Sequence, residues 1–223
     1  MLTVKDAPPI HIPASAFSFA GFRRWANSPD YPQHGRICYI RGEIEVDRNA
    51  DELRHHNPVK SAILADLTHL IRAEKLGKVL ADGVRLVNED GDVISEPDLV
   101  FASYESIQSG KVRYVPSVDE SDRLVEMEGT PDLVLEVVSK HSVQKDTIEL
   151  PKAYFEGGIP EYWLIAASEK VVDFQVLIRG DLEYGKSAKG ADGYVFSPTL
   201  KRFFLLSRTP DGSGHYDYQL LWR

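Results

Sequence analysis

The sequence predicts an α/β protein, of the α+β kind, in which helices flank a mixed β-sheet. Strand-like segments alternate along the chain with two segments of helical periodicity. One segment, "PDLVLEVVS", is almost continuously apolar, which is typical of a central strand buried on both faces. With 223 residues, 43% of them hydrophobic, the chain is long enough for a single domain with an ordinary core.

The first 35 residues differ in composition from the rest. Residues 1–35 are rich in Pro, Ala and Ser, which predicts an N-terminal arm with low order outside one short helix at "FSFAGFRRWA". The two arginines of this helix predict a solvated face, and a contact with a DNA backbone or a partner subunit is the alternative. We therefore place the main domain at residues 36–223.

The first half of the main domain predicts strands around one long helix. "RICYIRGEIEVD" predicts a strand or a hairpin, and "KVLADGVRLV" and "VISEPDLVFAS" each predict one strand, with a turn at "NEDGD" between them. The helix lies between the first two of these segments. We expect Asn57 as its N-cap, Pro58 in its first turn and Gly77 as its stop.

The second half predicts one more helix and further strands. Residues 104–123 are polar, with a short helix near "SYESIQSG", and "PDLVLEVVS" follows as a strand. "KDTIELPKAYFEGGI" predicts a helix with Pro151 in its first turn or at a kink. "EYWLIA" and "KVVDFQVLIRG" predict two strands, "YGKSAKGADG" a loop, and "YVFSPTLKRFFLLSR" a terminal β region.

Composition and charge exclude several classes of protein. A net charge of -8 argues against a passive nucleic-acid coat protein, although acids that hold a metal ion are compatible with a nuclease. Cys38 is the single cysteine, so an internal disulfide and a Cys-based zinc site are excluded. We see neither a signal peptide nor an apolar run near the roughly 18 residues of a membrane span, and we expect a cytoplasmic protein.

Three acids in two strand-like segments are the strongest functional signal. Asp132 and Glu136 lie four residues apart, so they share one face of a strand, and Asp98 could face the same site if the two strands pair. Such carboxylates suit Mg²⁺ or Mn²⁺. The metal would activate a water molecule, and a nearby lysine would stabilise the charge that develops on a phosphate.

Structural explanations exist for each of these acids. An Asp after Pro is often a turn former, so Asp98 and Asp132 could simply begin their strands. Glu136 lies within the apolar run, where a carboxylate is costly unless it is paired or bound to a metal. A strand edge or a salt bridge to a lysine would also explain it.

The segments "SEPDLVF", "GTPDLVLEVVS" and "KDTIELPKAYFEGGIPEYWLI" together resemble the Uma-two family of restriction endonucleases, in the PD-(D/E)xK nuclease superfamily. The resemblance covers about residues 37–165. It implies a restriction-endonuclease-like core and phosphodiester hydrolysis with Mg²⁺ or Mn²⁺. It also implies DNA as the substrate and a homodimer, because cutting two strands calls for two sites.

The resemblance also implies roles for individual residues. Asp98 corresponds to the PD aspartate and Glu136 to the acid of the (D/E)xK element, while Asp132 resembles the second Pro-Asp acid of the family. Glu43 in "IRGEI" and His56 in "RHHNPVKSAI" resemble further family positions, and we expect both near the metal.

The lysine of the (D/E)xK element is missing. Val138 occupies that position, and Leu150 occupies the helical position from which family members are thought to supply the lysine. Lys145 is the first candidate to replace it and Lys152 the second. If neither reaches the site, the chain would be an inactive module that keeps the nuclease fold for binding or assembly.

Overall fold

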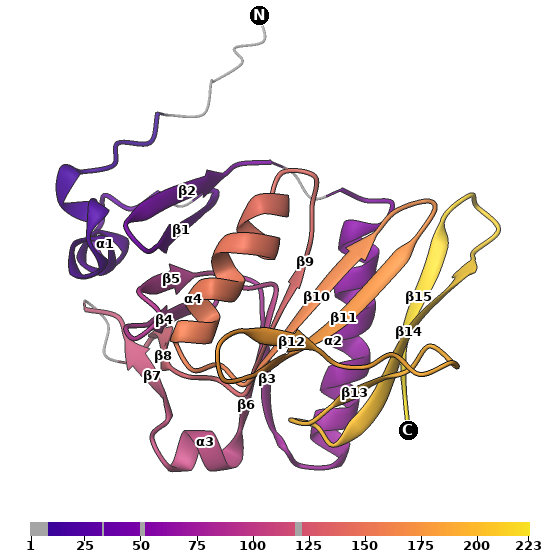
Figure 1. Cartoon of the computed structure of the whole chain (residues 1–223). Coiled ribbons are helices and arrows are strands. Elements are labelled where there is room, and N and C mark those ends of the chain that lie inside the picture. The colour runs from indigo at the N-terminus through magenta and orange to yellow at the C-terminus, as the bar shows by residue number, and fades with distance from the viewer. Residues whose placement is uncertain (1–8, 33, 50–51, 119–121) are drawn as a thin grey trace, which may run out of the picture.

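The structure, a computed structural model, describes residues 9–32, 34–49, 52–118 and 122–223. It has the predicted α/β class, with helices on a mixed β-sheet (Figure 1). The expected single sheet is wrong, because the strands divide into two six-stranded sheets and one three-stranded sheet. No helix in the described part of the chain has the length and apolar character that a membrane span requires.

The central sheet has the order β12-β11-β10-β9-β6-β3. Its strands are β3 (Gly77–Ala81), β6 (Leu99–Ser103), β9 (Leu133–Val137), β10 (Glu161–Ala167), β11 (Val172–Arg179) and β12 (Tyr184–Lys186). Strand β9 lies between β6, to which it is antiparallel, and β10, to which it is parallel. All five of its residues are buried, which confirms the predicted central strand.

The second sheet has the order β2-β1-β5-β4-β8-β7. Its strands are β1 (Arg36–Ile40), β2 (Glu43–Asp47), β4 (Arg85–Asn88), β5 (Val93–Ser95), β7 (Val112–Pro116) and β8 (Leu124–Gly129). A third sheet at the C-terminus contains β13 (Val195–Ser197), β14 (Arg202–Pro210) and β15 (Tyr216–Trp222). Strands β7, β8, β12 and β15 fall outside the segments in which we expected strands.

Helices cover both faces of the central sheet. Helix α2 (His56–Ala73) lies on one face and α4 (Leu150–Glu156) on the other, and the remaining helical segments of the described residues are η1 (Ala14–Phe17), α1 (Phe19–Ala26), α3 (Tyr104–Gln108) and the π-helical segment η2 (Lys145–Glu149). One core cluster joins α2 and the C-terminal sheet to one face of the central sheet. A second joins α4 and the second sheet to the other face (Figure 1).

Two of the expected strands are broken. Each of the segments "KVLADGVRLV" and "VISEPDLVFAS" contributes one strand to the central sheet and one to the second sheet. The first segment turns at Asp82 and Gly83, which both have positive φ, and the second breaks around Pro97. The chain therefore crosses from one sheet to the other within each of these two segments, and Asp98 lies at the crossing in the second segment.

The long helix α2 has different ends from those expected. It begins at His56, and its first turn is capped by the Glu52 carboxylate, which accepts three backbone N–H bonds of 2.6 to 3.1 Å, rather than by Asn57. It ends at Ala73, where Lys75 takes up the positive φ of 54°. Gly77, the expected stop, instead begins β3.

The expected solvated face of the N-terminal helix is present only in part, because Arg24 is exposed whereas Arg23 is engaged and the opposite face is buried. Phe22 and Trp25 of α1 are buried against the second sheet. Arg23 pairs with two glutamates of β8, Glu126 and Glu128. Helix α1 is thus attached to the domain, while the domain boundary at residue 35 remains a prediction, and part of the arm, residues 1–8 and 33, lies outside the described residues.

Candidate active site

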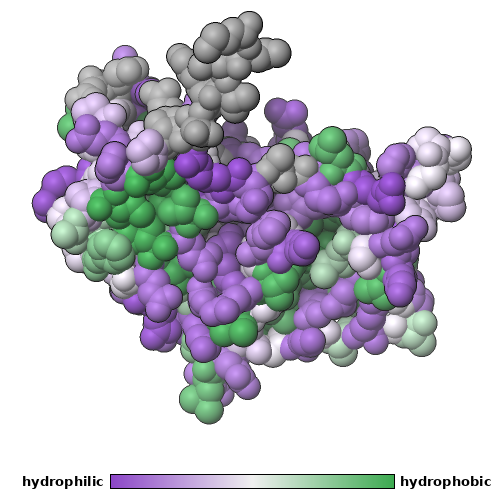
Figure 2. Space-filling model, turned by 90° about the horizontal axis from the view of Figure 1, so that it is seen from above, coloured by the Kyte–Doolittle hydropathy of each residue, from purple (hydrophilic) through white to green (hydrophobic). Residues whose placement is uncertain are grey.

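A cavity of about 550 Å³ opens where β6 begins and β9 ends. Asp98, Glu136, His56 and Lys145, four of the predicted site residues, line it. The face of the molecule seen from above in Figure 2 is mainly hydrophilic, with one hydrophobic patch at the left. Among the described residues, acids outnumber lysines and arginines in the lining: Glu45, Asp47, Glu52, Glu96, Asp98, Glu136 and Asp146 against Arg36, Lys140 and Lys145. Such a lining attracts cations.

The register of two antiparallel strands brings Asp98 and Glu136 together. Leu99 pairs with Leu135, so Asp98, one residue before Leu99, lies opposite Glu136. Alternation along a strand places side chains two residues apart on the same face. Both acids therefore face the α4 side of the sheet, on which Val100 and Val134 also lie.

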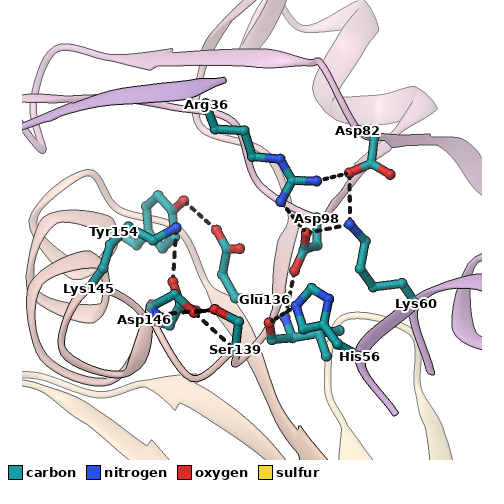
Figure 3. A network of polar contacts seen from close by, with 12 residues as sticks. Arg36, His56, Lys60, Asp82, Asp98, Glu136, Ser139, Lys145, Asp146 and Tyr154 are labelled. Carbon is teal, nitrogen blue, oxygen red and sulfur yellow. Dashed lines mark hydrogen bonds and ion pairs between the residues drawn. The ribbon is translucent and has the colours of Figure 1, made fainter. Parts of the chain in front are cut away.

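The carboxylate of Asp98 is fully engaged. Its Oδ2 accepts the backbone N–H of Val137 at 2.8 Å. Its Oδ1 pairs with Lys60 Nζ at 3.0 Å and with Arg36 Nη1 at 3.2 Å. Figure 3 shows Asp98 between these two cations and Glu136. Two cations and an N–H donor thus offset the burial of this carboxylate.

Glu136 has a different environment. Its side chain is 3% exposed, and its carboxylate accepts a hydrogen bond from the Tyr154 hydroxyl at 3.3 Å. Within the described residues it forms no ion pair, and Figure 3 shows it pointing into the space between Asp98 and Lys145. Burial raises the pKa of Glu136 well above its usual value of 4.5, a shift that Lys145 opposes and the negative charges of Asp146 and Asp98 increase. Glu136 is therefore a buried acid without an ion pair among the described residues, and Lys145 is the cation whose charge acts on it.

Lys145 reaches the same cavity from the helix that follows β9. Its Nζ pairs with Asp146 Oδ1 at 3.0 Å, and its side chain is 17% exposed. Burial by itself would lower the pKa of Lys145, but the nearby Glu136 carboxylate and the other acids raise it, so the lysine stays charged.

A π-turn sets the position of Lys145. The N–H of Leu150 donates to the carbonyl of Lys145, five residues before it. Pro151 follows and has no N–H with which to continue an α-helical ladder through this turn. Segments of this kind carry one extra residue per turn, which directs Lys145 into the cavity while Leu150 is fully buried in the core.

Three predicted residues lie elsewhere. Asp132 precedes β9 at the end opposite to Glu136, where it accepts hydrogen bonds from Ser103 N at 2.7 Å and Ser106 Oγ at 2.8 Å and so holds the start of α3, whose N-cap is Ser103. Glu43 is exposed at the first position of β2, and Lys152 is exposed on α4. The cavity lining contains none of these three.

His56 lies at the cavity wall. Its Nε2–H donates to the carbonyl of Val137 at 2.7 Å, so this nitrogen is engaged with the end of β9. The backbone N–H of Val137 donates to Asp98. His56 and Asp98 therefore fix the carbonyl and the N–H of Val137, the residue that follows Glu136.

Sequence reasoning missed four polar residues of the site: Arg36, Lys60, Asp146 and Tyr154. Lys60 and Tyr154 had a local signal, because each lies on the buried face of its helix, beside Val59 and Ala153 respectively. Arg36 had none, because its place depends on how the second sheet meets the central one.

The site suits a divalent cation in part. Among the described residues, no three His, Cys, Asp or Glu side chains converge closely enough to hold a metal as they stand. Mg²⁺, however, usually binds through one or two carboxylates plus water and substrate phosphate. The Glu136 carboxyl group is buried opposite Asp98, and a cation bound between the two would stabilise its ionised form.

Comparisons with known proteins agree with the predicted family and with the fold. The model of the Uma2 family, described as "Putative restriction endonuclease", matches residues 19–196. A crystal structure of a "putative nuclease belonging to DUF820" from Anabaena variabilis shares the fold, with a TM-score of 0.59 and 16% identity. The match covers 82% of this chain and 90% of that one. No curated protein matches the chain.

Proposed function

The chain belongs to the Uma2 family of restriction endonucleases, and from this premise we propose that it is a metal-dependent endonuclease that hydrolyses phosphodiester bonds of DNA. The observation that carries the proposal is the buried Glu136 carboxylate, opposite Asp98 at the base of a cavity of about 550 Å³ and without an ion pair among the described residues. A buried, uncompensated carboxylate is costly unless a cation completes its environment.

Each residue of the cavity has a distinct role in this proposal. Asp98 and Glu136 bind Mg²⁺ or Mn²⁺, which when bound would lower the pKa of a water molecule and neutralise phosphate charge. Lys145, kept charged by the surrounding acids, orients the attacking water or stabilises the charge on the phosphate. Tyr154 orients Glu136 through its hydroxyl.

The other predicted residues support the site or lie outside it. His56 holds the carbonyl of Val137 and so fixes the end of β9. We assign no direct role in the reaction to Glu43, Asp132 and Lys152, because they do not line the cavity. A homodimer and a cytoplasmic location remain expectations that follow from the two-strand chemistry and from the cysteine content.

Metal binding tests the proposal most directly. We expect Mn²⁺ to bind to the wild type in calorimetry and Glu136→Gln to abolish binding, because the amide keeps the shape of the side chain but removes its charge. Glu74→Gln is the matched control, since Glu74 pairs with Arg202 at 2.9 Å and does not line the cavity. Conversion of supercoiled plasmid to nicked and linear forms should follow the same order. Absence of Mn²⁺ binding by the wild type, with and without DNA, would refute the proposal.

A second candidate is an inactive module with the nuclease fold. It is favoured by Leu150, which is fully buried in the core at the position where family members carry the helical lysine. The experiments separate the two, since an inactive module would bind DNA or protein without cleaving plasmid in either Mg²⁺ or Mn²⁺.

A further inference from the structure

Two cations and two carboxylates form a cluster of ion pairs beside the cavity. The Arg36 guanidinium spans two acids, with Nη1 3.2 Å from Asp98 and Nη2 2.9 Å from Asp82. Lys60 Nζ lies 3.0 Å from each of the same two acids. The charges of the four side chains balance, so any cation that binds to Asp98 must disturb the balance (Figure 3).

The two cations differ in their freedom to move. Lys60 is 8% exposed and extends from α2, so separating it from its acids would leave a buried charge without compensation. Arg36 is 37% exposed, stands at the first position of β1 and lines the cavity. Its second partner, Asp82, is 58% exposed, and ion pairs at such exposure are weak. Arg36 is thus the cation that can leave Asp98.

A metal ion bound to Asp98 would favour the separation of Arg36 from this carboxylate. It would neutralise the carboxylate and repel the guanidinium a few ångströms away. A guanidinium presents a planar fork of donors that matches phosphate oxygens. Once it had separated from Asp98, the Arg36 guanidinium would face the space between Asp98 and the opening of the cavity.

We propose that Arg36 is a phosphate-binding residue whose availability depends on the metal: Asp98 holds it in the metal-free protein and releases it to a backbone phosphate of DNA when the metal binds. This inference rests on the proposed function. It makes metal and DNA binding mutually favourable, because each removes a competitor of the other.

The test compares Arg36→Gln with Arg41→Gln. Arg41 is a matched control, because it pairs with Glu156 at 2.9 Å, has a similarly exposed side chain and does not line the cavity. Binding of a fluorescein-labelled DNA duplex is measured by anisotropy in EDTA and in Ca²⁺, which takes the same oxygen ligands as Mg²⁺ and slows hydrolysis. Ca²⁺ affinity is measured by calorimetry, and the melting temperature in EDTA reports folding.

Arg36→Gln should have opposite effects on the two ligands. We expect Ca²⁺ to bind about threefold more tightly, because a competing positive charge is gone. DNA should bind about tenfold more weakly in Ca²⁺, the loss typical of one charge-assisted contact, yet within about twofold of wild type in EDTA. Arg41→Gln should change DNA affinity by the same small factor in both conditions.

Lys60→Met gives a second, independent test. It should also tighten Ca²⁺ binding, but it should leave the effect of Ca²⁺ on DNA affinity intact, because Arg36 is still present. The inference is overturned if Arg36→Gln weakens DNA binding equally with and without Ca²⁺, if it weakens Ca²⁺ binding, or if only Lys60→Met abolishes the coupling. Failure of the wild type to bind Ca²⁺ or Mn²⁺ would overturn the proposed function as well, whereas normal wild-type metal binding would confine the failure to Arg36.

Discussion

The same four residues, Pro-Asp-Leu-Val, occur twice in the sequence, at opposite ends of one pair of strands, and the two copies serve different purposes. In the first copy, Asp98 begins at the cavity end of β6, where it meets two cations and lies opposite Glu136. In the second, Asp132 precedes β9 at the far end, where it holds the start of α3 through hydrogen bonds from Ser103 and Ser106. The two strands run antiparallel, so equal positions in sequence become opposite positions in space.

The comparison teaches that local sequence fixed the backbone but not the chemistry. In both copies the proline and aspartate start a buried strand, as their turn preference predicts. What distinguishes the copies is their surroundings. Asp132 accepts hydrogen bonds at the start of a short helix, whereas Asp98 pairs with Arg36 and Lys60 at a cavity that Lys145 also lines. Removing the charge from each aspartate should therefore have different consequences.

The largest difference is expected between Asp98→Asn and Asp132→Asn. Asp98→Asn should lower plasmid cleavage by about a thousandfold, because a metal ligand and its charge are lost. Asp132→Asn should leave cleavage within about threefold and lower the free energy of unfolding by about 1 kcal/mol, because its hydrogen bonds at the start of α3 lose their charge. Initial cleavage rates and urea unfolding measure these effects. Equal loss of cleavage in both variants would mean that the two ends are not functionally distinct.

A second pair of variants asks which lysine belongs to the cavity end. Lys145→Met should lower the cleavage rate by about a hundredfold, because a preorganised charge at the phosphate is lost. Lys152→Met should leave the rate unchanged, since Lys152 is exposed on α4 outside the cavity. Single-turnover rates at saturating Mn²⁺ make the measurement independent of metal affinity. The reverse order would move the catalytic lysine to α4.

A smaller effect is expected from Tyr154→Phe. Its hydroxyl lies 3.0 Å from Ser95 Oγ and 3.3 Å from Glu136, so its loss should weaken Mn²⁺ binding about tenfold, as is typical for residues that orient a metal ligand. Ser95→Ala is the control, because it removes the far hydrogen bond and keeps the one to Glu136. Calorimetry measures both. Equal losses in the two variants would indicate a general packing defect.

The smallest effect concerns stability and pH. Because burial raises the pKa of Glu136 above its usual 4.5, the fold favours the protonated acid. That contribution is complete below pH 4.5 and is lost as the pH rises through the raised pKa. In EDTA at pH 8, Glu136→Gln should therefore unfold at a higher urea concentration than the wild type. Its free energy of unfolding should be higher by about 1 kcal/mol or more. At pH 4.5 the two should agree. Equal stability at both values would mean that Glu136 is compensated in the fold.

The sequence predicted the strands and helices with strong periodicity. Strand β9, helix α2 and strands β10 and β11 were found where "PDLVLEVVS", "NPVKSAILADLTHLIRAEKLGK", "EYWLIA" and "KVVDFQVLIRG" predicted them, although α2 ends earlier than expected, at Ala73. The turns within "KVLADGVRLV" and "VISEPDLVFAS" were missed, because apolar residues on both sides of Asp82 and Pro97 resemble one strand. Whether two such halves enter one sheet or two depends on contacts distant in sequence.

The candidate site was predictable only where its residues lie on those elements. Asp98 and Glu136 follow from strand pairing and alternation, and Lys145 from its place at the helix entrance. Arg36 and Lys60 lie 62 and 38 positions before Asp98 and meet it only through the meeting of the two sheets. No local pattern encodes such a contact, and the resemblance to the family did not name these residues either.

The passage of the chain from the second sheet to the central sheet at Asp98 has a mechanical consequence. Arg36 belongs to one sheet, Glu136 to the other, and Asp98 to the connection between them. The ion pairs beside the cavity are thus also fasteners between the two halves of the molecule. A metal ion that bound in the cavity would break one of these ion pairs. Metal binding would therefore also change the rigidity of the junction between the two sheets.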